Sequence, residues 1–510
     1  MAYRDFQDFL DALQSAGELK RIAEPLSPYL EITEVADRVM KSGGPALLIE
    51  KPVGRTPRLG TPDPKSAVMG QPSIHPPAAA PSREFGMPVA INTYGSRKRM
   101  SMALGVEDYE EHADRLRGLL KPEVPRGPIE ALKLLPGLLR EVASAPPRSA
   151  SRALCQERVL QQGEFDLTDF PALTCWPEDG GPYVTLPLVF THDPTTGKRN
   201  VGMYRVQIQG KDECGMHWQM HKTGQRHMEE SRRPLEVAVC LGGDPALAFG
   251  AISPLPPGID ELLFCGFLRR ERVSTIRCKT LDVEVPADCE IVLEGTVDPA
   301  ERRLEGPFGD HTGYYSLAAD FPVFRVHCVT MRERPVWPAT IVGQPPMEDG
   351  WMGKAVERIF LPLIQLTVPE IVDMNLPVEA CFHNVAFVSV RKKYPGHAYK
   401  AMNAIWGLGG LAFTKFVFVF DEGTNVHDIG EVLFRIGANC DPGRDTLHSR
   451  GPVDQLDHAA QVEGFGGKVG FDCTEKWPGE SGFTRDFPKL IEMAPDVREK
   501  IDALWPRLGL

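Results

Sequence analysis

The stretch CEIVLEGTV (residues 289–297) decides the fold, because it is one of several short strand-like runs in the middle of the chain. The others include VTLPLVFTHD (184–193), VGMYRVQIQG (201–210) and FPVFRVHCV (321–329). Gly, Pro and Asp residues stand between these runs and mark turns. Short strands separated in this way are typical of an antiparallel sheet or barrel, which we expect from about residue 153 to residue 330.

The N-terminal region predicts an α/β domain over residues 1–125. Four apolar residues recur at helical spacing within residues 3–16, and the strand-like run PALLIEK (45–51) follows. Residues 54–85 are instead rich in Pro, Ala and Ser, and such a segment cannot bury enough apolar surface to fold alone. We therefore expect a mobile loop there, inserted in the first domain.

The C-terminal region predicts a second α/β domain over residues 331–510, after a central domain over residues 126–330. FVFVF (416–420) is a near-continuous apolar run, typical of a strand buried on both faces. Apolar residues at helical spacing follow it, and Asn425 stands where a helix cap would be expected. The fold class is therefore a mixture of α/β and mainly-β domains.

An apolar stripe lies at the end of the chain. Its members recur at helical spacing: Val497, Ile501, Leu504, Trp505 and Leu508. A stripe this apolar requires a cover, which either another part of the same subunit or a neighbouring subunit could provide.

Composition excludes several classes of protein. The formal net charge of −12 disfavours binding to nucleic-acid phosphates. No apolar run reaches the length of a membrane-spanning helix, and the N-terminus does not have the pattern of a secretion signal. The eleven cysteines are scattered without a CxxC pair, which fits a reducing cytoplasm better than a disulfide framework.

The sequence does not match three familiar motifs. GFGGKVG (464–470) matches neither a P-loop nor a dinucleotide fingerprint, so we interpret it as a glycine-rich turn. HWQMH (217–221) lacks the glutamate of a zincin helix, and two polar histidines on one face are the plainer interpretation. No GxSxG sequence is present, which argues against a serine hydrolase.

The segment EGPFGDHTGYY (305–315) is the strongest candidate for chemistry. It brings Glu305 and Asp310 to one turn, because the glycines and the proline between them preclude a regular element. Two carboxylates at a tight turn can have separated pKa values, so that one stays ionised while the other serves as an acid. A solvated acidic turn is the equally weighted alternative.

Residues 199–208 add polar groups to this candidate site. Arg205 would form a carboxylate–guanidinium–carboxylate network if it met both acids, although a lone arginine is more often a surface charge. Asn200, Glu261 and His217 offer hard O and N ligands, which suit Mn²⁺ or Mg²⁺ rather than a structural zinc.

At these segments the chain closely resembles the UbiD family of decarboxylases. The resemblance extends over most of the chain, with residues 54–85 as the main departure, and is nearer to the bacterial 4-hydroxy-3-polyprenylbenzoate type than to the fungal ferulic acid type. The segments that carry it are LTCWPEDGGP (173–182), RNVGMYRVQI (199–208), GDPALAFGAISPLP (243–256), EIVLEG (290–295), EGPFGDHTGYY (305–315), YPGHAYKAMNAIWG (394–407), DPGRDT (441–446) and KWPGE (476–480).

The resemblance implies a fold and a set of cofactors. Family members have an N-terminal α/β domain, a split β-barrel that binds prenylated FMN, and a C-terminal α/β domain that mediates assembly. A divalent metal, usually Mn²⁺ with Mg²⁺ as the alternative, binds the flavin phosphate, and some members also hold K⁺. Asn200 and Glu261 match the metal ligands, and His217 matches a further ligand of some members. The positions that match flavin contacts are Met203, Tyr204, Arg205, His217, Trp218, Gln219, Lys222 and Thr223.

The resemblance also implies catalytic roles. Asp310 matches the family's proton donor, Arg205 the group that holds the substrate carboxylate, and Glu305 the group that orients Arg205. The expected reaction is the reversible decarboxylation of an aromatic or unsaturated acid.

The resemblance also implies a range of substrates and a set of partners. The bacterial type suggests 4-hydroxy-3-polyprenylbenzoate in quinone biosynthesis, whereas menaquinone-pathway and other aryl acids are alternatives. A flavin prenyltransferase would supply the cofactor, a long prenyl substrate would favour the membrane surface, and the terminal helix suits a dimer or hexamer. Two rival interpretations are an ordinary FMN oxidoreductase on a split barrel and a non-catalytic assembly protein.

Overall fold

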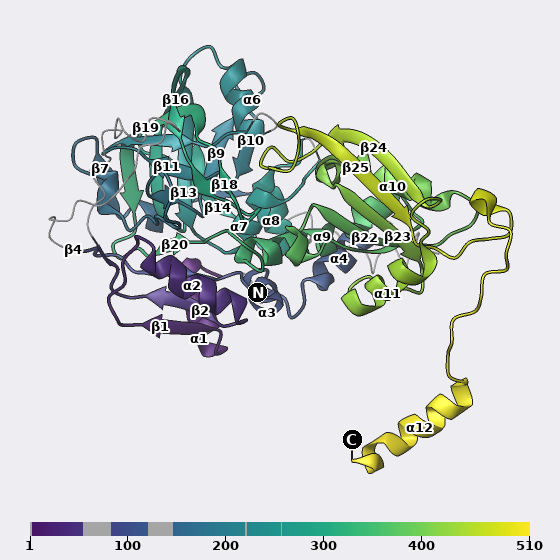
Figure 1. Cartoon of the computed structure of the whole chain (residues 1–510). Coiled ribbons are helices and arrows are strands. Elements are labelled where there is room, and N and C mark those ends of the chain that lie inside the picture. The colour runs from purple at the N-terminus through teal and green to yellow at the C-terminus, as the bar shows by residue number, and fades with distance from the viewer. Residues whose placement is uncertain (1–2, 55–82, 121–145, 220–221, 257, 510) are drawn as a thin grey trace, which may run out of the picture.

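The chain folds as a mixed α and β protein, which confirms the expected fold class (Figure 1). The computed structural model describes residues 3–54, 83–120, 146–219, 222–256 and 258–509. Nearly all of the Pro-rich segment predicted as a mobile loop at 54–85 therefore lies outside the described residues.

The N-terminal region is a four-stranded sheet with helices packed beside it. The strand order is β1-β2-β5-β20, in which β1 is parallel to β2, β5 is antiparallel to β2, and β20 is parallel to β5. The elements are α1 (Phe6–Ser15), β1 (Leu19–Ile22), α2 (Glu31–Lys41), β2 (Ala46–Ile49), β3 (Val53–Gly54), β4 (Arg83–Glu84), β5 (Val89–Ile91), α3 (Arg97–Ala103), α4 (Glu110–Leu120) and β20 (Trp337–Ala339).

Helix α1 forms as its sequence predicts. The Asp5 side chain caps the helix by accepting a hydrogen bond from the backbone N–H of Asp8. The four apolar residues at helical spacing are all buried, and Gly17 follows in a left-handed conformation (φ 72°) that favours glycine and ends the helix. The strand predicted at 45–51 is also present, as β2.

Strand β20 ties the N-terminal sheet to a distant part of the sequence. It lies beyond residue 330, where the C-terminal domain was predicted to begin, yet it pairs with β5. One hydrophobic cluster also joins Phe6 of α1, Phe190 of the central sheet and Phe360 of α9 (Glu348–Thr367). The division into domains at 1–125, 126–330 and 331–510 therefore stays a prediction about folding units.

The central region is the antiparallel sheet that the sequence predicts. Its strand order is β10-β9-β13-β16-β19-β12-β11-β8, with β7 paired to β19. The bounds are β7 (Arg158–Gln161), β8 (Tyr183–Val184), β9 (Leu188–His192), β10 (Arg199–Gly202), β11 (Val206–Ile208), β12 (Glu213–Met216), β13 (Leu235–Gly242), β16 (Cys289–Glu305) and β19 (Ala319–Met331).

Helices and short strands surround this central sheet (Figure 1). Strand β14 pairs with β15 and β6 in a separate small sheet, and β17 pairs with β18 in a hairpin between β16 and β19. The bounds are β6 (Arg148–Ser149), α6 (Thr223–Glu230), α7 (Ala246–Ile252), α8 (Glu261–Arg269), β14 (Ser274–Arg277), β15 (Glu284–Pro286), β17 (Phe308–Gly309) and β18 (Tyr315–Ser316).

The C-terminal region is a five-stranded sheet in the order β21-β22-β23-β25-β24, and it has a hydrophobic core of its own. Its neighbouring strands β22, β23 and β25 are parallel, whereas the two edge strands are antiparallel to their neighbours. The bounds are β21 (Ile371–Asn375), β22 (Val385–Val390), α10 (His397–Trp406), β23 (Phe416–Asp421), α11 (Ile429–Asn439), β24 (Thr446–Pro452), β25 (Phe465–Asp472) and α12 (Pro495–Leu508).

Two sequence predictions for this region were wrong in detail. The glycine-rich segment 464–470 is not a turn, because most of it forms β25, where Lys468 donates to the carbonyl oxygens of Ala412 and Thr414. The helix after β23 is capped by Asp428 rather than by Asn425, since the Asp428 carboxylate accepts from the N–H of Glu431. Short-range spacing does not determine which of two neighbouring cap residues is used.

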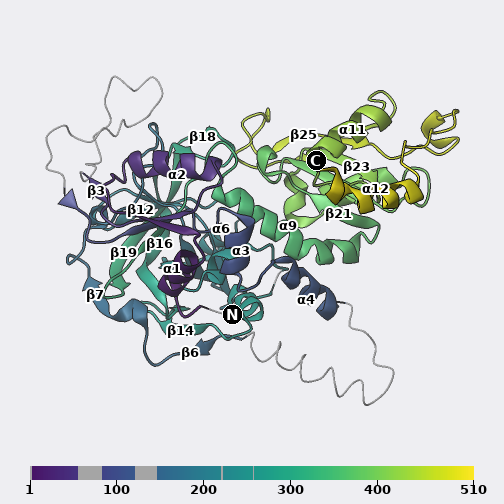
Figure 2. The same cartoon turned by 90° about the horizontal axis from the view of Figure 1, so that it is seen from below.

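The terminal helix α12 lies apart from the body of the protein (Figure 1). The view from below superimposes it on the C-terminal sheet, but the first view separates the two (Figure 2). None of its residues is buried by the described part of the chain, and Trp505 is 53% exposed. The described residues of the same subunit therefore do not cover this helix, which favours the alternative of a second copy.

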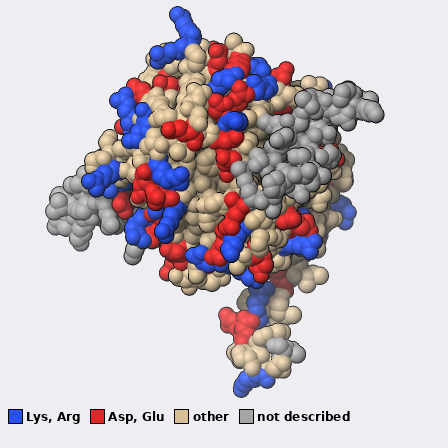
Figure 3. Space-filling view, turned by 90° about the vertical axis from the view of Figure 1, so that its left-hand side faces the viewer, with Lys and Arg blue, Asp and Glu red and all other residues tan. Residues whose placement is uncertain are grey.

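One face of the molecule carries charges of both signs. Lys and Arg side chains alternate with Asp and Glu side chains over the face shown in Figure 3. Among the described residues, no helix combines the length and apolar character needed to cross a bilayer.

Deleting residues 495–510 should lower the oligomeric state without destabilising the rest of the fold, because no residue of α12 is buried against the described part of the chain. Light scattering after size-exclusion chromatography measures the mass, and thermal unfolding provides the control. An unchanged assembly mass would contradict this role for α12.

Candidate active site

The end of strand β16 and the hairpin that follows it position two carboxylates. Glu305 is the last residue of β16, and Asp310 directly follows β17. Arg205 lies between β10 and β11, which belong to the same central sheet as β16. The sheet therefore brings together residues that are 100 and 105 positions apart in the sequence.

Arg205 meets both carboxylates, which is the condition for the expected network. Its Nε donates to Glu305 Oε1 at 2.9 Å and its Nη2 to Glu305 Oε2 at 3.2 Å. Its Nη1 donates to Asp310 Oδ2 at 2.5 Å, and Nη2 also donates to Ser316 Oγ at 3.0 Å. The Phe308 ring packs 4.6 Å below the guanidinium carbon. The interpretation of Glu305 and Asp310 as a solvated acidic turn is therefore wrong.

Electrostatics keep this network fully charged. Glu305 is completely buried, which by itself would raise its pKa, but Arg205 and His217 hold the pKa at about 2. The pKa of Asp310 is likewise pulled below its ordinary value, against the effect of burial, by hydrogen bonds from His311 and by the charge of Arg205. The two acids in turn raise the pKa of Arg205. Both carboxylates are consequently ionised at neutral pH.

His217 lies on the other side of Glu305. Its Nδ1 is 2.9 Å from Glu305 Oε2, and its ring packs against Phe321. Burial and the nearby Arg205 lower its pKa. Its Nε2 is buried and lacks a hydrogen-bond partner among the described residues.

A neighbouring loop holds the hairpin in place. Asp179 accepts hydrogen bonds from the backbone N–H groups of Cys175, Trp176 and Gly309 at 2.8–2.9 Å. Gly180 donates to the Pro307 carbonyl at 2.7 Å, and a Cβ on Gly180 would lie 2.2 Å from the Gly306 oxygen. Only glycine fits there, so the loop and the hairpin are packed backbone to backbone.

A cavity of about 240 Å³ opens beside the network. Arg205, His217 and Asp310 line it from the central region, and Asp454 and Leu456 line it from the C-terminal region. A molecule in this cavity would contact the charged network and both regions at once.

Some of the residues expected to hold a flavin and a metal line an adjacent cavity of about 610 Å³. Asn200 and Glu261 both lie in its wall, together with Lys222 and Thr223 at the start of α6. Met203, Tyr204 and Lys222 line this cavity and the smaller one alike. His217 and Gln219 line only the smaller one, so the third expected metal ligand is not brought to the cavity of the other two.

Several polar atoms in this area have no partner within the described part of the chain. They are Asn200 Nδ2, His217 Nε2 and Trp218 Nε1, all of them buried. Burial also raises the pKa of Glu261 to about 7, although its carboxylate accepts from the N–H of Val201. Buried polar groups normally have partners, so these residues fit a polar cofactor and a cation.

Sequence reasoning missed several contributors to the site. Asp179 lies inside the quoted segment LTCWPEDGGP and His311 inside EGPFGDHTGYY, so a closer examination of these segments could have found them. Ser316, His383 and Asp454 gave no signal, because only tertiary contacts bring them to the network. His221 of the rejected HWQMH motif lies outside the described residues.

The chain matches family models along most of its length. The model of the 3-octaprenyl-4-hydroxybenzoate carboxy-lyase Rift-related domain matches residues 148–345. The N-terminal and C-terminal domain models of the same carboxy-lyase match residues 10–70 and 350–473.

Full-length relatives show the same likeness. An uncharacterized protein of Aquifex aeolicus is 47% identical, with 100% of this chain and 99% of that protein covered. The closed form of vanillic acid decarboxylase from Sedimentibacter hydroxybenzoicus superimposes with a TM-score of 0.82 at 23% identity over 100% of both chains. An evolved dimeric form of HmfF from Pelotomaculum thermopropionicum, in complex with prFMN, superimposes with a TM-score of 0.74 at 26% identity over 97% of this chain and 98% of that chain.

Replacing Arg205 with alanine should destabilise the fold by about 3–5 kcal/mol, because two buried carboxylates would lose their counter-charge. Urea unfolding of Arg205→Ala gives the measurement. Arg277→Ala is the matched control, since its ion pair with Asp282 is exposed and should contribute no more than about 1 kcal/mol. Equal effects of the two substitutions would contradict the charge network as a stabilising unit.

Proposed function

The chain belongs to the UbiD family of carboxy-lyases, and from that premise we propose that it reversibly decarboxylates an aromatic or α,β-unsaturated acid with prenylated FMN. The Arg205–Glu305–Asp310 network at the wall of a cavity is the observation that carries this proposal. Such a network can hold a carboxylate and supply a proton, whereas hydride transfer to a nicotinamide requires neither acid.

The flavin would occupy the larger cavity and reach into the smaller one, since Met203, Tyr204 and Lys222 line both. Trp218 Nε1 and His217 Nε2 lack partners in the described part of the chain, which supports polar contacts to the flavin, and Gln219 adds a further contact. When bound, the prenylated flavin supplies the electron sink for the pair that departing CO₂ leaves behind.

The flavin phosphate would lie near the start of α6. Lys222 and Thr223 stand at this N-terminus, which favours negative charge. Asn200 and Glu261 line the same cavity and would hold Mn²⁺ or Mg²⁺ against the phosphate. His217 lines the smaller cavity, so we assign its buried Nε2 to a flavin contact, with the third metal position as the alternative; this atom has no partner among the described residues. A K⁺ ion is a further candidate near the phosphate.

Arg205 would bind the substrate carboxylate. Its hydrogen bonds to Glu305, Asp310 and Ser316 leave one N–H of Nη1 for that purpose. Glu305 orients the guanidinium through both of its oxygens. Asp310 would then protonate the carbon from which CO₂ has left, and by microscopic reversibility would remove that proton in carboxylation.

A hydroxyaryl acid is the substrate class that we favour. The description of the matching family model supports 4-hydroxy-3-polyprenylbenzoate in quinone biosynthesis, and menaquinone-pathway acids are the alternative. A flavin prenyltransferase would supply the cofactor, and a polyprenyl tail would bring the enzyme to the membrane surface. The exposed α12 supports a homodimer or hexamer.

Coexpression with a flavin prenyltransferase tests this function. We expect prenylated FMN by mass spectrometry of the released cofactor, and CO₂ release from hydroxybenzoates. Asp310→Asn should keep the flavin and lose about 10²–10⁴-fold in rate, whereas Asp320→Asn, an exposed control, should change neither. Plain FMN together with nicotinamide turnover would support an oxidoreductase instead. Full activity of Asp310→Asn would remove Asp310 from the proposed chemistry.

Glu261→Gln should lower the metal content and with it the flavin content, because the amide cannot replace the charge of a carboxylate ligand. Elemental analysis should show a metal affinity reduced by about 10-fold or more. Glu271→Gln, near the surface end of α8, is the matched control. An unchanged Mn²⁺ stoichiometry in Glu261→Gln would exclude Glu261 as a ligand.

A further inference from the structure

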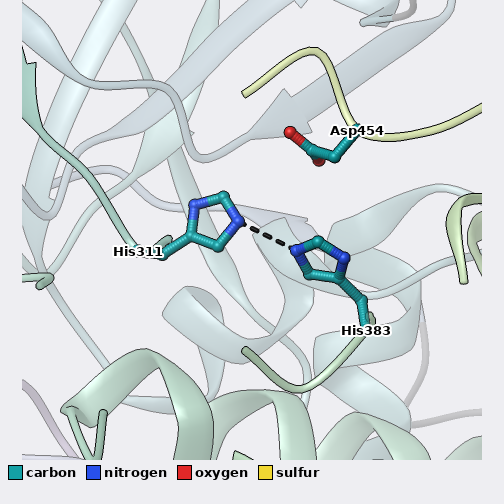
Figure 4. A group of neighbouring side chains, drawn as sticks. All are labelled: His311, His383 and Asp454. Atoms are coloured by element: carbon teal, nitrogen blue, oxygen red, sulfur yellow. Dashed lines mark hydrogen bonds between the residues drawn. The ribbon is translucent and has the colours of Figure 1, made fainter. Parts of the chain in front are cut away.

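Two histidines connect Asp310 to the C-terminal region, and Figure 4 shows the contact between their rings. His311 Nδ1 is 3.0 Å from Asp310 Oδ1, and His311 Nε2 is 2.9 Å from His383 Nε2. His383 precedes β22, so the pair bridges the hairpin and the C-terminal sheet. Asp454 lies beside the gap between the two rings.

The hydrogen-bond partners of Asp310 leave only one route for a proton within the described chain. Arg205 Nη1 and the backbone N–H of His311 both contact Asp310, and both groups only donate. The third contact is His311 Nδ1, which can either give or take a proton. Apart from the cavity, His311 is therefore the group that can exchange a proton with Asp310.

Asp310 needs a source of protons if it is to act as an acid. Asp310 is held as a carboxylate by Arg205 and His311, yet the proposed reaction consumes one proton in each turnover. The same contact raises the pKa of His311 to about 9, against the lowering effect of burial, so the proton resides on the imidazole at neutral pH. The protonated imidazole of His311 is thus hydrogen-bonded directly to the carboxylate of Asp310.

We propose that His311 supplies the proton that Asp310 delivers to the substrate carbon, and that His383 positions the His311 ring for this transfer. The proposal rests on the proposed function, in which Asp310 is the acid. The Nδ1–H bond of His311 breaks and an O–H bond forms on Asp310. That O–H bond then breaks as the C–H bond of the product forms. After product and CO₂ leave, solvent in the cavity returns one proton to the neutral pair.

The contact between the rings explains the positioning role of His383. Two nitrogens at 2.9 Å require one proton between them, so one ring donates and the other accepts. Burial, together with the charge of His311, lowers the pKa of His383 to about 4, which makes it the acceptor. With His311 Nε2–H directed at His383, Nδ1–H points at Asp310.

The surrounding charges favour this arrangement. The acidic groups that act on His311 are Asp310, Asp349 at the start of α9, and Asp454. His383 is exposed to the fields of Asp454, Asp457, Lys415 and the charged His311. The acids stabilise one positive charge on the pair, and the two rings together hold that single charge.

The pH dependence of decarboxylation tests the supply role. The wild-type rate should be lost as the pH rises through about 9, because His311 must be protonated. His311→Asn can still hydrogen-bond to Asp310 but cannot titrate. The variant should therefore be active only in the acidic range in which Asp310 itself is protonated, with a rate at pH 8 reduced by about 10²-fold or more. A merely structural role predicts an equal loss at every pH and would overturn the proposal.

Variants of His383 test its positioning role separately from the proton supply by His311. His383→Phe should lower kcat with little change in KM, whereas His383→Gln keeps a hydrogen-bond acceptor and should recover most of the rate. His458→Asn, an exposed histidine near Asp454 in the sequence, should behave as wild type. Equal rates for the Phe and Gln variants of His383 would refute its positioning role.

A second measurement does not depend on turnover. Histidine NMR of the flavin-loaded enzyme should show His311 still protonated at pH 8, and neutral at that pH in Asp310→Asn. If the NMR result is as expected but no carboxylic acid substrate is decarboxylated, the proposed function is wrong, whereas His311 remains the protonated group beside Asp310. A neutral His311 in the wild type would overturn the proposal. The metal content provides a further check. If His383→Gln loses a bound metal that Glu261→Gln retains, the ion lies at the histidine pair. Such an ion would replace the shared proton, and this result would also overturn the proposal.

Discussion

The salt-bridge network of Arg205 with Glu305 and Asp310 is the constraint on which the site depends. A guanidinium and two carboxylates removed from water are tolerated only when each charge has its partner, because an uncompensated buried charge costs several kcal/mol. The surrounding structure meets that requirement. Ser316 accepts from Arg205, Phe308 packs against the guanidinium, and the loop at 173–182 holds the hairpin through its backbone.

The same network favours binding of a substrate carboxylate by Arg205 but opposes proton donation by Asp310. Strong pairing makes Arg205 a permanent cation that can hold a carboxylate, but it also keeps Asp310 ionised. A carboxylate held in this way can act as an acid only if a proton lies nearby. The contact of His311 with Asp310 resolves this conflict by adding a titratable group within hydrogen-bond reach. Asp454 and Leu456 of the C-terminal region also line the cavity beside the network. The central and C-terminal regions therefore both determine what can bind there.

On the other side of the network, the central sheet provides an environment suited to a large polar ligand. Asn200, Trp218 and His217 keep buried polar atoms without a partner among the described residues, and Glu261 is a carboxylate with a raised pKa. Groups of this kind are unfavourable in an isolated chain and become favourable when a cofactor and a cation are bound. The network and this area share His217, which contacts Glu305 through Nδ1, while its Nε2 has no hydrogen-bond partner within the described ranges.

The sequence by itself determined the local elements and the identity of the acidic turn. The α1 stripe, the central antiparallel strands and the segment 305–315 follow from periodicity and turn residues, which depend on near neighbours in the chain. The cap of α11, the strand at Phe465–Asp472 and the pairing of β20 with the N-terminal sheet did not follow, since each is selected by competition with tertiary contacts. Only the tertiary structure decided that Arg205 meets both acids and that His383 meets His311. These contacts join residues 72 to 105 positions apart, and their energy comes from shared burial, which spacing along a chain does not encode.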